Sequence, residues 1–254
     1  MGVIENMTNE DYHATADISS TVVKTVWKKS LAHWKGQKFT SSPALLIGSA
    51  LHGILLEPHR EIAIRGPKTR RSKAYTEMEQ DLGPDQVLLT EGEWYMVKGM
   101  AKSAMANPAF RKALEHPDRQ NEVSIFAECT STGLAVKARP DCMVKGIVYD
   151  VKSTIDSSPS GFAKECWKYA YPIQAAYYLY VCKLAQIDVE EFSFLAIEKT
   201  APYVAHQHVV GPELMDWAHE QVMATLRRIA DAKQLDDYGT GWGDFTLLEK
   251  PKWL

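Results

Sequence analysis

The chain has no cysteine pair spaced like a set of metal ligands. Its four cysteines lie far apart, and none forms a C-x-x-C motif. The spacing therefore excludes the usual signatures of zinc knuckles and iron–sulfur clusters. Free thiols of this kind indicate a cytosolic protein. The cysteines are Cys129, Cys142, Cys166 and Cys182.

Long apolar runs and a leader-like start are also missing. No stretch approaches the ~20 apolar residues that a membrane span needs. Residues 1–11 are polar and acidic, unlike the basic and apolar regions of a signal peptide. We therefore expect a cytoplasmic protein without a membrane partner.

An excess of positive charge is missing too, since the formal net charge is −3. A protein that coats its whole surface with nucleic acid is normally basic. Any nucleic-acid contact must therefore be local, in a groove or channel. The 254 residues are expected to form a single domain, with a core from about 10 to 235. The irregular tail, 236–254, contains tryptophans that could serve a subunit interface.

Hydrophobic periodicity predicts one α/β domain with a central mixed sheet flanked by helices. Residues 60–73 are basic, contain Gly and Pro, and are expected to form a mobile loop. The expected helices are 21–34, 44–57, 91–106, 108–114, 162–184 with an interruption at Pro172, and 212–234. The expected strands are 123–129, 134–144, 147–154, 191–198 and 205–210, the first three forming a meander.

Two aspartates and a lysine flank a predicted hairpin turn at Lys145-Gly146. A two-residue turn sets 144 opposite 147, and it sets Asp141 opposite Asp150, with Cβ atoms roughly 4.5–5.5 Å apart. Lys152 shares the face of Asp150. Opposed like charges destabilise a sheet, and a divalent cation between the two aspartates would reverse the sign of that effect.

Carboxylates of this kind suit Mg²⁺ or Mn²⁺, which take hard oxygen ligands. A nearby lysine can hold an attacking water or stabilise charge on a phosphate. The alternative is a surface ladder of ion pairs between Arg139, Asp150 and Lys152.

Two helical motifs add polar groups to apolar segments. His52 stands on the apolar helix expected at 44–57, one turn after Gly48, and a neutral imidazole can ligate a divalent ion. Gln174 and Tyr178 are four residues apart and share a helix face. They can contact a phosphate or position a water. The alternatives are a hydrogen-bonded core histidine and a polar rim on a packed helix.

Two groups of residues are candidates for binding DNA phosphates. The first is the densest basic run of the chain, which could equally be a solvated loop. The second stands at the start of the first long helix and could bind a terminal phosphate. The first group is Arg65, Lys68, Arg70, Arg71 and Lys73, and the second is Ser19, Ser20 and Lys24.

In this order the motifs resemble the PD-(D/E)xK nuclease superfamily. The resemblance is to its RecB-like branch, and within it to the nuclease domain of exonuclease VIII (RecE) and related phage-type exonucleases. The superfamily pattern is a helix with His, a Pro-Asp, a D/E-x-K and a helix with Q-x-x-x-Y. The matching segments are Gly48 to His52, Arg139-Pro140-Asp141, Asp150-Val151-Lys152 and Gln174 to Tyr178.

The resemblance implies a role for each matched residue. His52, Asp141 and Asp150 match metal ligands, joined by the Val151 carbonyl, and Lys152 matches the catalytic lysine. Gln174 and Tyr178 match the helix motif behind the active site. Glu122 matches, in a loose alignment, an acidic residue of some members. Asp150 stands where the family often has Glu.

The resemblance also implies an activity and partners. The expected enzyme is a Mg²⁺-dependent exodeoxyribonuclease, with Mn²⁺ as a substitute, acting on linear duplex DNA. It would degrade the 5′-ended strand and leave 3′ overhangs for single-strand annealing recombination. A homo-oligomeric ring around DNA, tetrameric or alternatively trimeric, and a RecT-like annealing partner are expected. The implied origin is bacterial, phage or prophage.

Three alternatives remain open. The same core could belong to a restriction- or repair-type endonuclease. An iron–sulfur nuclease of the superfamily is disfavoured by the cysteine spacing. A catalytically silent DNA-binding assembly protein is disfavoured by the intact set of Asp141, Asp150 and Lys152.

Overall fold

The computed structural model describes residues 2–38, 42–245, 247 and 250. The helices are α1 (Asn9–Ala14), α2 (Ser20–Lys28), α3 (Leu31–Gly36), α4 (Pro43–Leu56), α5 (Lys73–Gln80), α6 (Glu91–Ala106), α7 (Pro108–Leu114), α8 (Pro159–Tyr169), α9 (Tyr171–Leu184) and α10 (Pro212–Leu235). The strands are β1 (Gly2–Ile4), β2 (Ala63–Arg65), β3 (Val87–Leu89), β4 (Gln120–Asn121), β5 (Ser124–Glu128), β6 (Ala135–Ala138), β7 (Cys142–Val144), β8 (Ile147–Thr154), β9 (Glu191–Glu198) and β10 (Ala205–Val209).

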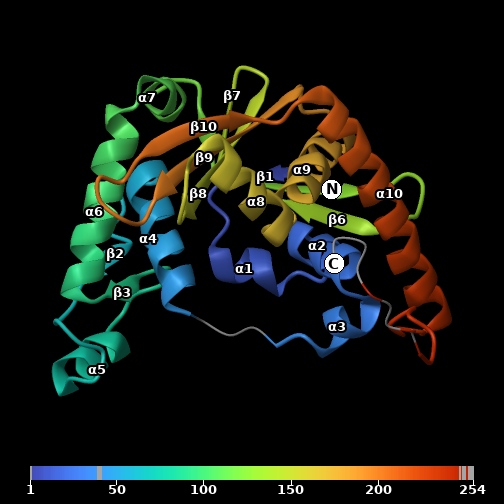
Figure 1. The fold of residues 1–254 in the computed structure, drawn as a ribbon, viewed down its shortest axis with the longest axis horizontal. Helices are drawn as coiled ribbons and strands as arrows, with labels where there is room; N and C mark the ends of the chain where they lie inside the picture. Colours follow the sequence, from blue (N-terminus) through green and yellow to red (C-terminus); the bar gives the residue numbers. More distant parts are fainter. Residues whose placement is uncertain (1, 39–41, 246, 248–249, 251–254) are drawn as a thin grey trace.

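A mixed five-stranded sheet forms the centre, in the order β10-β9-β8-β7-β4. Strands β8 and β9 are parallel, and the other neighbours are antiparallel. Parallel neighbours need a long crossover, which α8 and α9 provide. Figure 1 shows α4 and α6 on one flank of this sheet and α10 on the other. The structure confirms the predicted α/β architecture.

The central sheet is buried on both faces. Along β9, Phe192 and Phe194 pack into a core with α2, α9 and α10. Their neighbours Leu195 and Ile197 pack into a second core with α4, α6 and α7. Because alternate residues point to opposite faces, a nearly continuous apolar strand supplies both cores. The sheet is therefore a rigid platform for the polar residues at its centre.

The prediction of a single strand at 134–144 is wrong. This segment divides into β6, which pairs with β5 in a separate three-stranded sheet β1-β5-β6, and β7, which joins the central sheet. The predicted meander is therefore wrong as well. Pro140 lies at the break, and proline has no N–H to donate to a ladder. The break frees Asp141 from strand pairing.

The helix expected at 21–34 is also two elements, α2 and α3. Ser30 causes the division, because its hydroxyl accepts the His33 N–H at 3.2 Å and caps α3. The helix expected at 162–184 is confirmed as α8 and α9, with the interruption at Ala170 rather than Pro172.

The expected mobile loop at 60–73 contains a strand, because β2 pairs with β3 in parallel. The elements α1, α5, β1, β3 and β4 were not expected from the sequence. Within the described segments, no helix has the length and apolarity to cross a membrane. The expected tail, 236–254, lies partly outside the described residues.

Candidate active site

The β7–β8 hairpin carries the two aspartates and the lysine. Its register is the predicted one, with Cys142 opposite Tyr149 and Val144 opposite Ile147. Lys145 and Gly146 turn the chain with φ angles of 50° and 78°, as a type I′ turn requires. The ladder ends at Cys142, so Asp141 lies just beyond it. The Asp141 carboxylate there accepts the Val151 N–H at 2.7 Å.

Helix α4 delivers His52 to the same place. The helix starts at the Ser42 cap, whose hydroxyl accepts the Leu45 N–H. The Nε2 atom of His52 lies 2.9 Å from the Val151 carbonyl oxygen. Its Nδ1 atom lies 3.5 Å from Asp141 Oδ2. The imidazole therefore contacts both hairpin strands and faces the Asp141 carboxylate.

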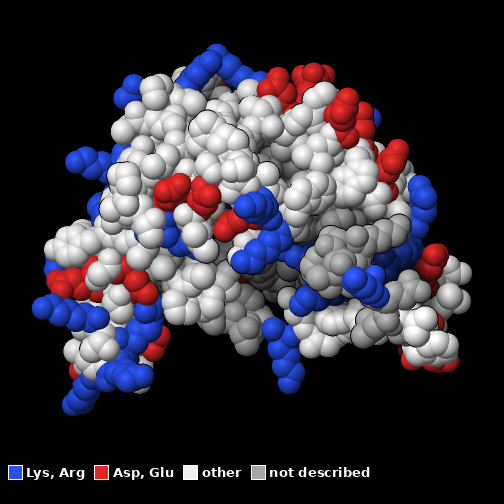
Figure 2. Space-filling model, viewed as in Figure 1, with Lys and Arg blue, Asp and Glu red and all other residues white. Residues whose placement is uncertain are grey.

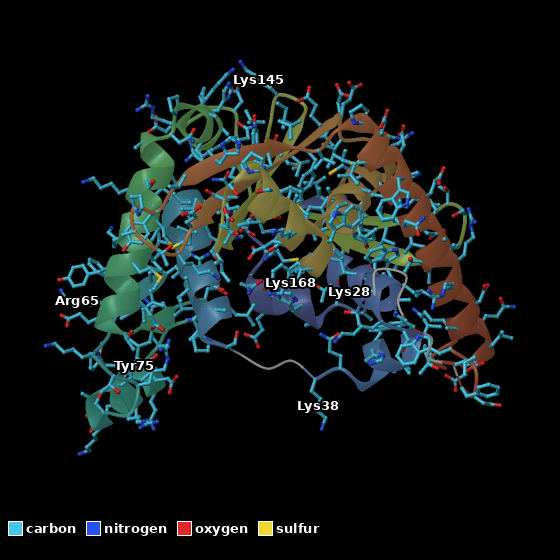
Figure 3. All side chains as sticks on the ribbon, viewed as in Figure 1. Lys28, Lys38, Arg65, Tyr75, Lys145 and Lys168 are labelled. Carbon is cyan, nitrogen blue, oxygen red and sulfur yellow. The ribbon has the colours of Figure 1, made fainter. Side chains whose placement is uncertain are left out.

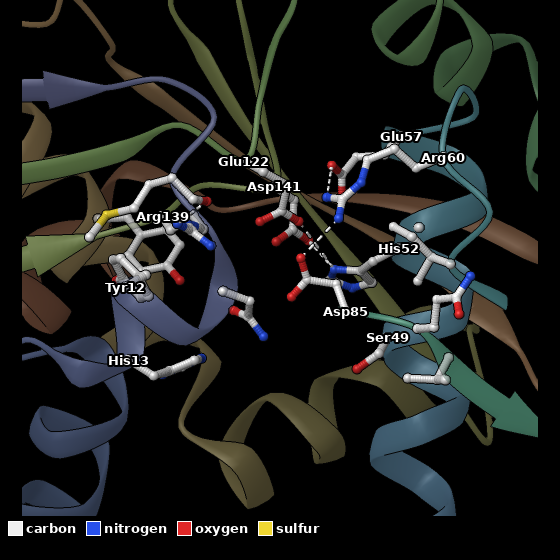
Figure 4. Close-up of a pocket in the computed structure, with 17 residues that line it drawn as sticks. Tyr12, His13, Ser49, His52, Glu57, Arg60, Asp85, Glu122, Arg139 and Asp141 are labelled. Carbon is white, nitrogen blue, oxygen red and sulfur yellow. Dashed lines mark hydrogen bonds and ion pairs between the residues drawn. The ribbon is translucent and has the colours of Figure 1, made fainter. Parts of the chain in front are cut away.

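Glu122 completes a three-residue cluster with His52 and Asp141. One ligand atom from each of the three lies within 4.8 Å of the others, and Glu122 Oε1 is 3.9 Å from His52 Nδ1. Glu122 has a φ of 51°, and its N–H donates to the Asp141 carbonyl at 3.2 Å. Figure 4 shows the three side chains converging from the residue before β7, from α4 and from the segment before β5. This backbone hydrogen bond positions Glu122, which the sequence matched only loosely to an acidic residue of the superfamily.

Asp150 lies on β8, where the register of the hairpin sets it across from Asp141, and it is fully buried. Lys152 forms an ion pair with it. Gln174 Nε2 donates to Asp150 Oδ2 at 2.9 Å, and Gln174 Oε1 accepts from Lys24 Nζ at 2.9 Å. The Oδ1 atom of Asp150 is buried and takes part in the ion pair with Lys152, without a hydrogen bond of good geometry.

The residues at the centre fit a divalent cation. Two carboxylates and an imidazole converge beside the Asp150–Lys152 ion pair. Burial raises the pKa of Asp141, as the proximity of Asp150 and Glu122 also does. Burial acts to lower the pKa of His52, but the Asp141 and Glu122 carboxylates raise it to about 9. The two carboxylates thus favour a positive charge at this position, which a bound cation can supply in place of the imidazole proton.

A cavity of about 420 Å³ opens beside this cluster. His52, Glu122, Asp141 and Tyr178 line it, and α1 contributes Tyr12 and other residues to its wall. Figure 4 shows Arg60 at the edge, between Glu57 and Asp85; it contacts them at 2.7 and 2.9 Å. The contact between Arg60 and Asp85 was not expected from the sequence, because the two residues lie in separate segments.

Arg139 does not take part in a ladder with Asp150 and Lys152, as one alternative supposed. Its buried guanidinium instead donates to Ser124 Oγ at 2.6 and 2.9 Å and to the Met7 carbonyl at 2.9 Å. The guanidinium carbon of Arg139 also lies 4.4 Å from the centre of the Tyr12 ring. Arg139 therefore fixes the N-terminal segment against the cavity.

The candidate phosphate-binding residues lie in two different places. Ser20 is buried at the start of α2, and Lys24 reaches Gln174 one turn later. Ser19 precedes them as the helix cap, without a capping hydrogen bond from its side chain. The basic run lies on the arm formed by β2 and α5, away from the centre (Figure 3). Its ion pairs join Arg65 to Glu91, Arg70 to Glu93 and Lys73 to Glu77, whereas Lys68 and Arg71 form none among the described residues.

Basic side chains also gather at the centre of one face, between α8 and α2 (Figure 2). Lys28 and Lys168 belong to this group (Figure 3). A local basic area on an acidic chain agrees with the expectation from net charge.

This fold and this arrangement of groups define a domain of the PD-(D/E)xK type. Residues 23–241 match the family described as a PDDEXK-like domain of unknown function, and the chain belongs to that family. The resemblance to the superfamily that the sequence motifs predicted is thereby confirmed.

The comparison with solved structures includes a protein that shares this fold. A "putative exonuclease" from Eubacterium rectale matches with a TM-score of 0.66 and 16% identity, over 98% of this chain and 96% of that chain. A phage related exonuclease from Haemophilus somnus matches with a TM-score of 0.40 and 11% identity, over 87% of this chain and 96% of that chain. No curated protein matches this sequence. At 16% identity, the similarity to the Eubacterium rectale protein shows a shared fold.

Proposed function

We propose that this protein is a metal-dependent exodeoxyribonuclease that hydrolyses phosphodiester bonds of linear duplex DNA. One observation carries the proposal: His52, Glu122 and Asp141 converge beside the buried Asp150–Lys152 pair in a PD-(D/E)xK domain. The name of the similar Eubacterium rectale protein supports the exonuclease activity.

His52, Glu122 and Asp141 would hold the cation, together with Asp150 Oδ1 and the Val151 carbonyl. Mg²⁺, with Mn²⁺ as a substitute, suits this oxygen-rich set. When bound, the ion would polarise the scissile phosphate and lower the pKa of a bound water.

The protein's own groups would position the reacting atoms. Lys152 is partly exposed, with 16% of its side-chain surface accessible, so its ammonium can reach a phosphate oxygen or the attacking water. The ion pair with Asp150 fixes the position of that ammonium. Gln174 holds Asp150 from α9, and Lys24 holds Gln174 from α2. This arrangement stabilises the charge that develops on the phosphate.

We also propose that the 5′-ended strand is degraded, leaving 3′ overhangs. The contact of Lys24 with Gln174, and the position of Ser20 one turn earlier on α2, support a role for them in binding a 5′ phosphate. The resemblance to RecE-type domains supports a homo-oligomeric ring and a RecT-like annealing partner. Light scattering on the purified protein tests the ring, and a monomer would contradict it.

A comparison of DNA substrates tests the activity. Linear duplex and covalently closed circular duplex are incubated with the protein and Mg²⁺, and acid-soluble nucleotides are measured. The proposal predicts release from linear DNA alone, because an exonuclease needs an end. Linearisation of the circle would indicate an endonuclease on the same core. A preference for 5′-phosphorylated over 5′-hydroxyl ends would support the role of Ser20 and Lys24.

A further inference from the structure

Two tyrosines flank the junction between α8 and α9. Tyr169 ends α8, Tyr171 begins α9, and Ala170 between them takes a left-handed conformation with φ of 54°. This conformation is unfavourable for a residue with a Cβ, but Ala170 is buried and caps α8 through its N–H. The junction therefore holds the two rings next to each other, with centroids 5.5 Å apart and planes inclined by 27°.

The stacked pair begins at the proposed catalytic lysine and ends in solvent. Lys152 Nζ lies 5.0 Å from the centre of the Tyr171 ring. Phe162 and Phe194 support Tyr171 from behind, at 5.8 and 5.4 Å between ring centroids. Tyr169 is the outer member and has 44% of its surface exposed. An aromatic surface thus leads away from the site of hydrolysis.

Ammonium groups accompany this aromatic surface. Lys168 Nζ lies 5.1 Å from the centre of the Tyr169 ring. Lys28 donates to the Lys168 carbonyl oxygen, and thereby connects α2 to the α8–α9 junction. Among the described residues, Lys28 and Lys168 form no ion pair with a carboxylate. Their charges are available to anionic groups that approach along the rings.

Exposed aromatic rings beside unpaired cations suit single-stranded nucleic acid. Bases stack on aromatic side chains irrespective of sequence, and ammonium groups bind the intervening phosphates. A duplex hides its base faces within the stack, so only an unpaired base can use the Tyr169 ring. The Tyr171 ring lies between Tyr169 and Lys152, so such a base would lie near the site of hydrolysis.

We propose that Tyr169 is a stacking platform for an unpaired base of the DNA strand being degraded, with Lys168 binding the neighbouring phosphate. The inference rests on the proposed nuclease function and extends it. Tyr169 holds the strand end apart from its complement and steers it past Lys152. Tyr169 is then a positioning residue, since it touches the strand but not the reacting atoms.

Fluorescence of 2-aminopurine tests the platform. Single-stranded oligonucleotides carry the probe at successive positions and are titrated with the full-length protein in EDTA, which prevents metal-dependent hydrolysis. The wild-type protein should quench the probe at one or two adjacent positions. Tyr169→Ala should abolish that quenching and weaken binding about tenfold or more, the effect of losing one base–aromatic stack. Tyr169→Phe should retain both, because it keeps the ring.

Tyr95→Ala is the matched control, because Tyr95 is a similarly exposed tyrosine (55%) on α6, beside Arg65. The Tyr95→Ala protein should quench the probe and bind the oligonucleotide as the wild type does. Equal quenching and affinity in Tyr169→Ala, or no position-dependent quenching in the wild type, would overturn the platform. Cleavage of linear duplex by the same preparations separates the two proposals. If the wild type does not cleave, the nuclease function fails; if both proteins cleave and bind alike, only the platform fails.

Discussion

Gln174 holds the Asp150 carboxylate through a hydrogen bond of 2.9 Å from Nε2 to Oδ2. The other end of the same amide accepts a hydrogen bond from Lys24. Both acceptor and donor capacity of the amide are therefore used, and α2 and α9 are joined to β8 at a fully buried carboxylate. Substitution of a group that orients a metal ligand in this way typically lowers metal affinity or activity about 10- to 100-fold.

We expect Gln174→Ala to lower the rate of DNA cleavage about 10- to 100-fold, because Asp150 loses the donor that orients it. Gln207→Ala is the control, since Gln207 Nε2 bonds Ser193 Oγ at 3.0 Å and lies outside the site. Single-turnover cleavage of a linear duplex measures both variants. Equal rates in Gln174→Ala and Gln207→Ala would show that the orienting bond has no effect.

Divalent metal should stabilise the folded protein through the cluster of His52, Glu122 and Asp141. At a metal concentration about 100-fold above Kd, the gain in free energy of unfolding is about 2.7 kcal/mol. For a chain of this size that corresponds to roughly 5–10 °C in Tm. Asp141→Asn should remove most of the shift, while its amide oxygen can still accept the Val151 N–H.

The control for this experiment is Asp85→Asn. Asp85 lines the same cavity, but Arg60 holds its carboxylate at 2.9 Å. Differential scanning fluorimetry with and without Mn²⁺ should show the full shift in this variant. A full shift in Asp141→Asn as well would mean that the ion binds elsewhere.

The hairpin turn should respond in opposite directions to two neighbouring substitutions. Lys145 has φ of 50°, so Lys145→Gly relieves backbone strain and should raise stability by up to about 1 kcal/mol. Gly146 has φ of 78°, and Gly146→Ala should cost about 1–2 kcal/mol. A Cβ at Gly146 would meet only Asp188 O at 3.9 Å, so the cost is conformational. Urea unfolding measures both, and the same sign for the two changes would contradict the turn geometry.

Truncation of Arg139 should destabilise the protein by about 1–3 kcal/mol. Arg139→Ala leaves the Met7 carbonyl and Ser124 hydroxyl without their buried donor. Arg71→Ala is the control, because Arg71 is exposed and forms no ion pair within the described residues. Thermal unfolding followed by circular dichroism distinguishes them. An unchanged Tm for Arg139→Ala would favour the surface ladder that the sequence also permitted.

The sequence predicted the hairpin well, because its information is local. Lys145-Gly146 sets the turn type, and the turn type sets the register of β7 and β8. Helix α4 and its His52 were likewise predictable from the cap at Ser42 and the apolar run. These local rules placed Asp141, Asp150 and Lys152 relative to one another before any tertiary contact was considered.

Features that depend on non-local contacts were not predictable. The separation of β6 from β7 depends on which sheet each strand joins. The apolar pattern of residues 134–144 does not indicate that sheet. Arg139 is adjacent to the motif, but its partners are more than ten residues away in sequence. The basic run looked free, yet Glu91 and Glu93 of a later helix neutralise two of its arginines. Glu122 reaches the cluster through a left-handed backbone that its residue type does not indicate.

The most direct test of the central claim is cleavage of linear duplex DNA by Lys152→Ala in the presence of Mg²⁺. Lys183→Ala is the control, because Lys183 is an exposed lysine on α9. The Tm of each variant is measured alongside, since Lys152→Ala leaves the buried Asp150 charge unpaired. We predict that the rate falls at least about 10²- to 10³-fold in a folded Lys152→Ala protein and stays unchanged in Lys183→Ala. A folded Lys152→Ala protein that cleaves DNA at the wild-type rate would contradict the account.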